Sequence, residues 1–197
     1  TSGDNNVGVG VNAMQANTTG SDNVGVGRNA LIANEDGNFN TAVGSQALDA
    51  NTSANSNTAV GSIALTANTT GAANTAVGRN ALGANTTAAN NVAMGEGALE
   101  TTTDGAENVG IGTKALNKNT ASNNTAVGVE AMKLTTSGTQ NAAFGKAAMI
   151  TNTTGNYNTA LGPYALKLNQ TGANNTAIGY EALMNYTGGD NTAIGYR

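Results

Sequence analysis

The sequence contains no histidine, cysteine or tryptophan, and only one proline among its 197 residues. Without histidine and cysteine the usual nucleophile–base pairs and the commonest transition-metal ligands are missing, so an enzyme would have only carboxylate chemistry. The twelve acidic residues do not provide it, because they are scattered over turn and outward positions. The tightest pair, Glu35 and Asp36, fits a solvated turn. We therefore expect a protein that is not an enzyme and that binds no cofactor or metal ion.

Charge and long apolar runs are also scarce. Charged residues make up 10% of the chain and the net charge is −4. This composition gives neither the basic field that nucleic acid requires nor a polybasic anchor for acidic lipid. No run approaches the 18 apolar residues or so of a membrane span, so we expect no direct membrane insertion in this segment. Residues 1–5 also lack the basic and apolar regions of a signal peptide.

A repeat is what the sequence has in abundance. The pattern N-x-small-apolar-G-x-x-A-[L/M], seen from Asn40 to Leu48, occurs eleven times, and a twelfth copy is cut short. Nine of the eleven intervals between copies are 17 residues long and two are 16. A period that runs from end to end predicts one continuous array over residues 1–197, without an internal domain boundary. Because the array begins and ends within a unit, we expect a piece of a longer protein.

The residue types within one unit predict short strands joined by turns. Counting from the Asn as place one, place three is Ala or Gly, place four is a large apolar residue and place five is Gly. In a strand, places two and four share one face and place three has the other. Places eight and nine, Ala followed by Leu or Met, predict a second short strand, and the polar remainder predicts turns. The fold class is therefore all-β, a parallel β-solenoid of about eleven 17-residue coils, stacked about 4.8 Å apart. The Asn of place one is expected to form a side-chain ladder up one edge.

The core of each coil is slender. Each coil provides only two large apolar side chains, worth about 3–6 kcal/mol in all when fully buried. We therefore expect burial against other chains. The large residues of places four and nine are assigned to the core: Val9, Val26, Val43, Val60, Val77, Met94, Ile111, Val127, Phe144, Leu161, Ile178, Leu48, Leu65, Leu82, Leu99, Leu116, Leu166 and Leu183. The small residues of place three are assigned to inter-chain contacts: Ala42, Ala59, Ala76, Ala93, Ala126, Ala143, Ala160 and Ala177. The alternative is that alanine fills a narrow coil interior.

The unit N-T-A-V-G-x-x-A-L resembles the S-V-A-I-G coils in the heads of trimeric autotransporter adhesins, and it is similar to repeats in phage tail fibres. The resemblance implies a Yersinia-adhesin-like, left-handed β-roll in which three identical chains lie side by side. Carried over, Thr41 and Val43 would point into the coil and Ala42 toward a neighbour. The implied function is that of a homotrimeric, extracellular fibre head or shaft on a bacterial cell surface or a virion tail. Its partner would be a host or cell-surface protein or glycan.

Two other functions remain open. A filament subunit could pair its open coil edges end to end. A file of threonines at place thirteen could bind ice, although turn hydroxyls that bond the backbone would explain the same file. It comprises Thr18, Thr52, Thr69, Thr86, Thr103, Thr120, Thr136, Thr153 and Thr187. The five tyrosines all lie near the end of the chain, either as ligand contacts or as packing toward a next domain. They are Tyr157, Tyr164, Tyr180, Tyr186 and Tyr196.

Overall fold

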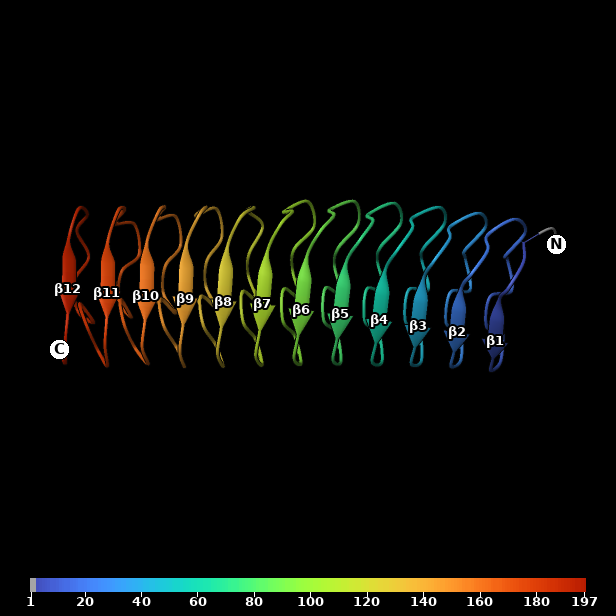
Figure 1. The fold of residues 1–197 in the computed structure, drawn as a ribbon, viewed down its shortest axis with the longest axis horizontal. Helices are drawn as coiled ribbons and strands as arrows, with labels where there is room; N and C mark the ends of the chain where they lie inside the picture. Colours follow the sequence, from blue (N-terminus) through green and yellow to red (C-terminus); the bar gives the residue numbers. More distant parts are fainter. Residues whose placement is uncertain (1–2) are drawn as a thin grey trace.

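The computed structural model describes residues 3–197, and its strands form a single parallel sheet. Twelve strands follow one another in sequence order, so that each is hydrogen-bonded to the strands before and after it. They are β1 Val7–Val9, β2 Val24–Val26, β3 Thr41–Val43, β4 Thr58–Val60, β5 Thr75–Val77, β6 Val92–Met94, β7 Val109–Ile111, β8 Thr125–Val127, β9 Ala142–Phe144, β10 Thr159–Leu161, β11 Thr176–Ile178 and β12 Thr192–Ile194. Figure 1 shows them side by side along one axis, with the chain making one turn between each strand and the next. The predicted β-solenoid of stacked coils is confirmed.

The register of the sheet follows the sequence repeat. Thr41 pairs with Thr58, and the next two residues of β3 pair with their equivalents in β4. A 16-residue interval keeps this register, because Val109 of β7 pairs with Thr125 of β8. Residues at the same place of the unit therefore form a column that runs the length of the solenoid. The residue type at that place then sets the character of the whole column, whether the column lies on the surface or in the core.

Only one strand forms in each coil. A second strand was expected at places eight and nine, but Leu48 at place nine has a φ of 51°, and Gln46, just before these places, has a φ of 59°. The left-handed conformation is incompatible with an extended strand and turns the chain back on itself. The Leu48 amide still donates a hydrogen bond to the Ala64 carbonyl of the next coil, at 3.0 Å. The prediction of a second strand was wrong, although the coils do pair at this place.

The interior of the coil is built from alanine and leucine. Ala42 of place three, Ala47 of place eight and Leu48 of place nine are fully buried. The core assignment is confirmed for the fully buried Leu48, Leu65, Leu82, Leu99, Leu116 and Leu166, while Leu183 is half-buried and packs against the core. The place-four assignment was wrong, because the residues assigned there do not belong to the buried core of the coil. They are Val9, Val26, Val43, Val60, Val77, Met94, Ile111, Val127, Phe144, Leu161 and Ile178.

The assignment of place three to inter-chain contacts was also wrong. The eight alanines assigned to these contacts all lie inside the coil with no exposed surface: Ala42, Ala59, Ala76, Ala93, Ala126, Ala143, Ala160 and Ala177. A side chain that is buried within its own coil cannot reach a neighbouring chain. The orientation carried over from the adhesin resemblance, with Ala42 outward and Val43 inward, is reversed.

The side chain at place nine explains this reversal. A Cβ added to Gly110 at place three would lie 3.2 Å from the Cγ of Leu99, which belongs to the preceding coil. A Cβ added to Gly25 would lie 2.8 Å from the Cγ of Met14 in the same way. The large residue of place nine therefore fills the interior against place three of the next coil. Only Ala or Gly fits there, and the large residues of places two and four must point outward.

Two ladders of asparagine side chains run inside the solenoid. At place one, the Asn57 Oδ1 accepts a hydrogen bond from the Asn74 backbone N–H at 2.9 Å, and the Asn57 Nδ2 donates to the Gly71 carbonyl at 2.9 Å. The expected ladder is confirmed, but it is buried and bonds mainly to the backbone. A second ladder at place twelve was not predicted: the Asn51 Nδ2 donates to the Asn34 Oδ1 at 2.8 Å. Both ladders satisfy buried polar groups that the small core could not otherwise accommodate.

The second ladder is interrupted where place twelve is not Asn. The Oδ1 atoms of Asn85 and Asn169 lack a hydrogen-bond partner, and the residues at place twelve of the following coils are Thr102 and Tyr186. The Oγ1 of Thr135, which itself occupies place twelve, is also without a partner. Each interruption leaves a buried polar atom unsatisfied, which costs about 1–3 kcal/mol.

Candidate functional surfaces

The outward face of the sheet is a uniform surface that continues over all twelve strands. We call it the Thr-x-Val face and define it as places two and four of β1 to β12. These places hold only Val, Thr, Ile, Leu, Met, Phe and Ala, without a charged residue. Val43, Phe144 and Leu161 are 36%, 40% and 48% exposed. A contiguous apolar surface of this kind is typical of an interaction site.

The threonines of this face differ from those of place thirteen. Within residues 3–197, the place-two threonines, such as Thr41 and Thr58, make no side-chain hydrogen bond. At place thirteen, by contrast, the Thr69 hydroxyl donates to the Thr86 carbonyl at 3.1 Å, and the Thr136 hydroxyl donates to the Thr153 carbonyl at 3.1 Å. The place-thirteen file therefore links coil to coil, and its regularity follows from this structural role.

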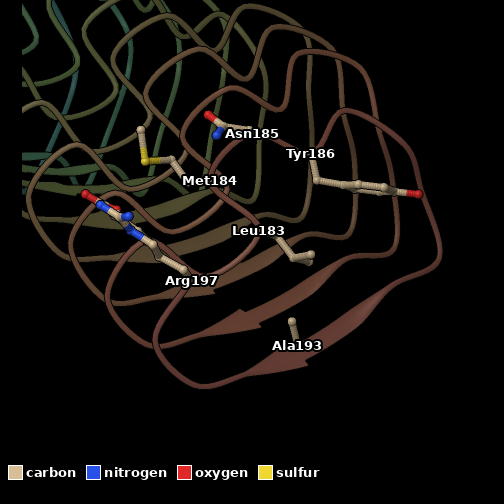
Figure 2. Close-up of a pocket in the computed structure, with 7 residues that line it drawn as sticks. Leu183, Met184, Asn185, Tyr186, Ala193 and Arg197 are labelled. Atoms are coloured by element: carbon tan, nitrogen blue, oxygen red, sulfur yellow. The ribbon is translucent and has the colours of Figure 1, made fainter.

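The five tyrosines do not form one site. Tyr164, Tyr180 and Tyr196 follow one another at places six and seven of successive coils. The rings of Tyr164 and Tyr180 meet edge to face with centroids 6.1 Å apart, and those of Tyr180 and Tyr196 stack at 5.4 Å. Tyr157 immediately precedes the Asn of place one, and Figure 2 shows Tyr186 on the side of the last coil opposite Arg197. Three of the five predicted ligand contacts are thus brought together.

Charged groups lie against the tyrosine file. The Lys167 Nζ is 5.2 Å from the centroid of the Tyr164 ring. The Arg197 Nε donates to the Glu181 carboxylate at 2.7 Å, and this hydrogen bond lowers the pKa of Glu181. The neighbouring Glu181 carboxylate raises the pKa of the Tyr180 hydroxyl, because it stabilises the protonated form of the tyrosine. The Glu181 charge is compensated locally, whereas Lys167 has no carboxylate partner among residues 3–197.

A basic region precedes the tyrosine file on the same side of the solenoid. The Lys133 Nζ lies 2.8 Å from the Glu130 carboxylate, and its hydrogen bond lowers the pKa of Glu130. Lys114 and Lys146 stand at places seven and six of the coils before and after that of Glu130, and their positive charges lower its pKa further. Within the described chain, neither Lys114 nor Lys146 forms a salt bridge. This region was not predicted from the sequence, although its signal is present there: five lysines lie between residues 114 and 167, with Glu130 as the only acidic residue of that stretch.

A pocket of about 570 Å³ opens on the last coil. Figure 2 shows Leu183 and Ala193 at this position, and both belong to columns that are buried elsewhere in the solenoid. The pocket is therefore the interior of the coil seen at the last described turn. It gives no argument for a small-molecule site.

Other kinds of site find little support within residues 3–197. No three His, Cys, Asp or Glu side chains are grouped so that they could hold a metal ion, and no helix has the length and hydropathy of a membrane span. No protein-family model matches the chain, and no curated protein or solved structure matches it either. The candidate surfaces are therefore the Thr-x-Val face and the basic side with its tyrosines.

Proposed function

We propose that the chain is a segment of a non-enzymatic, extracellular adhesive fibre in which three identical chains pack through their Thr-x-Val faces. The observation that carries this proposal is the uncharged outward face of the sheet, which continues over all twelve strands. Burying a Val or Leu side chain contributes about 1.5–3 kcal/mol, so the large residues of place four supply a substantial driving force once they are covered.

A second copy of the same chain is the best-matched cover. Side chains on this face recur once per coil, with a rise of about 4.8 Å, over a length on the order of 50 Å. Only a surface with the same rise can stay in register with such a face over many coils, and another copy of the solenoid has that rise by construction. Three copies around one axis would enclose all three faces in a shared core. The adhesin heads that the repeat resembles likewise hold three chains side by side, although there the resemblance implies contact through the small residue of place three.

A trimer of this kind would be a stiff rod, and its remaining surfaces would point outward in three identical sets. Linked copies of a weak site bind with higher avidity than one site alone, which suits attachment to a cell surface. The repeat resembles both bacterial adhesin heads and phage tail fibres, so the proposal covers a bacterial surface and a virion tail.

The molar mass in solution tests the proposal. Light scattering on a sizing column should give three times 19.4 kDa at every concentration. Val60→Glu places a carboxylate on the Thr-x-Val face and should yield monomers, because three charges would be buried without partners. Ser62→Glu is the matched control: Ser62 is exposed beyond the corner at Gly61, outside the face, so this variant should remain a trimer. A wild-type protein that is monomeric at all concentrations would refute the proposed assembly.

Ice binding is the second candidate, and the same face favours it. The hydroxyls of Thr41, Thr58 and Thr75 lie on consecutive strands in exact register and are free of protein hydrogen bonds within the described chain. In a monomer this file would be a flat, regular surface that could order water. A monomeric mass together with thermal hysteresis would favour this candidate, and Thr58→Lys should then abolish the hysteresis.

A further inference from the structure

A strip of basic and aromatic side chains follows the solenoid axis along the side beyond the carboxyl ends of the strands. We define this basic–aromatic strip as the following residues, all at places six, seven or ten of coils seven to twelve: Lys114, Lys133, Lys146, Tyr164, Lys167, Tyr180 and Tyr196. The backbone holds these places in line: the Tyr164 N–H donates to the Lys146 carbonyl at 3.0 Å, and the Arg197 N–H donates to the Tyr180 carbonyl at 3.1 Å. The strip is thus a continuous surface.

The charge of the strip stands out against the rest of the chain. Residues 1–107 contain nine acidic and two basic residues, whereas residues 108–180 contain five lysines and one glutamate. Lys114, Lys146 and Lys167 have no salt-bridge partner within residues 3–197. A net-negative protein that gathers unpaired lysines on one side of four neighbouring coils presents a local attraction for an anion.

The aromatic part of the strip restricts which anion fits. Tyr180 and Tyr196 are 42% and 70% exposed, and their rings stack side by side at 5.4 Å. Exposed tyrosine rings offer an apolar surface with a polar hydroxyl at the edge, which suits the C–H face and hydroxyls of a sugar ring. The lysines are spaced along successive coils rather than clustered, so they match a polymer that carries about one negative charge per unit. Nucleic acid, with its denser charge, requires a stronger basic field than this chain has.

We propose that the basic–aromatic strip binds an acidic polysaccharide, a chain of sugars with carboxylate groups, which lies parallel to the solenoid axis. The inference rests on the proposed function, because it names the class of surface ligand that the fibre would attach to. The strip lies round the glycine corner from the Thr-x-Val face, so it stays exposed when that face is covered. A trimer would present three parallel strips.

Titration calorimetry on the full chain tests the proposal with an oligogalacturonide as the probe. A malto-oligosaccharide of the same length is the neutral control, and an oligoglutamate of the same charge is the control for attraction without sugar recognition. We expect binding of the oligogalacturonide alone, with an affinity that falls as salt is added. Lys146→Gln should weaken binding about two- to fivefold, as for other exposed charge pairs, and Tyr180→Ala should weaken it about fivefold through loss of ring contact.

Two matched controls separate the strip from the rest of the surface. Arg28→Gln removes a cation at place six of the second coil, far from the strip, and Tyr186→Ala removes the tyrosine on the opposite side of the last coil (Figure 2). Neither should change the affinity. Absence of binding, equal binding of the oligoglutamate, or equal losses in strip and control variants would each overturn the proposal. The mass of every variant is measured in parallel, so a trimer that does not bind refutes the strip, while a monomer that binds refutes only the proposed assembly.

Discussion

Replacing Asn57 with alanine tests whether the buried asparagine ladder holds neighbouring coils together. The Asn57 Oδ1 is the acceptor for the Asn74 backbone N–H, and the Asn57 Nδ2 donates to the Gly71 carbonyl. The Gly71 carbonyl also accepts from Asn68 at 2.9 Å, so it keeps a partner in the variant. The Asn74 N–H would keep none, and a buried unsatisfied donor costs about 1–3 kcal/mol. Loss of the second hydrogen bond adds about 0.5–1.5 kcal/mol, for a total of about 1.5–4.5 kcal/mol.

Thermal unfolding and hydrogen exchange measure this effect at two scales. For a chain of this length, 1 kcal/mol corresponds to about 2–4 °C in the unfolding midpoint, so we expect a decrease of at least about 3 °C. Hydrogen exchange should show faster exchange of the Asn74 amide in particular, since its acceptor has been removed.

Asn185→Ala is the matched control. Asn185 is exposed and makes no side-chain hydrogen bond among the described residues, so this variant should leave the midpoint within about 1–2 °C of the wild type. If Asn57→Ala behaved like this control and the Asn74 amide remained protected, the asparagine ladder would not be what holds these coils together.

Three further substitutions probe the coil interior and its corners, each by the same unfolding assay. Leu82→Ala empties a fully buried position and should cost about 2–5 kcal/mol; a smaller loss would mean that place nine is not the core. Gly61→Ala should prevent folding of the array around its coil, because Gly61 has a φ of 138° and an added Cβ would lie 2.6 Å from the Gly78 carbonyl oxygen. A folded variant of unchanged stability would contradict this geometry. Thr135→Asn should raise the unfolding midpoint by a few degrees, which corresponds to about 1 kcal/mol of stability, since Asn at this place can accept a hydrogen bond from Asn152. A lowered midpoint would show that the ladder does not tolerate Asn at position 135.

The repeat alone determined the architecture of stacked coils. A unit of 17 residues that recurs with almost no insertions can be satisfied only by coils that stack in register, so strand positions and strand order followed directly. Gly at place five forms the corner after each strand, since Gly44 there has a φ of 142°, a conformation that residues with a side chain rarely adopt. The ladder of place one followed from the recurrence of a single amide residue.

The tertiary structure decided what lies inside and what lies outside. A strand of three residues alternates equally well with Ala42 inward or outward, so the sequence pattern was consistent with both orientations. Contact with the large residue of place nine in the preceding coil leaves room only for Ala or Gly at place three, and this reverses the assignment made from the sequence.

The left-handed conformation of Leu48 was equally hidden, because an apolar residue has no local preference for it and only stacking on the next coil stabilises it. The basic–aromatic strip depended on the same information, since it emerges only when the turns place Lys146, Tyr164 and Tyr180 on one side. The sequence determined the period and the columns, and the packing between coils decided which way each column faces, because that choice rests on contacts between residues that are distant along the chain.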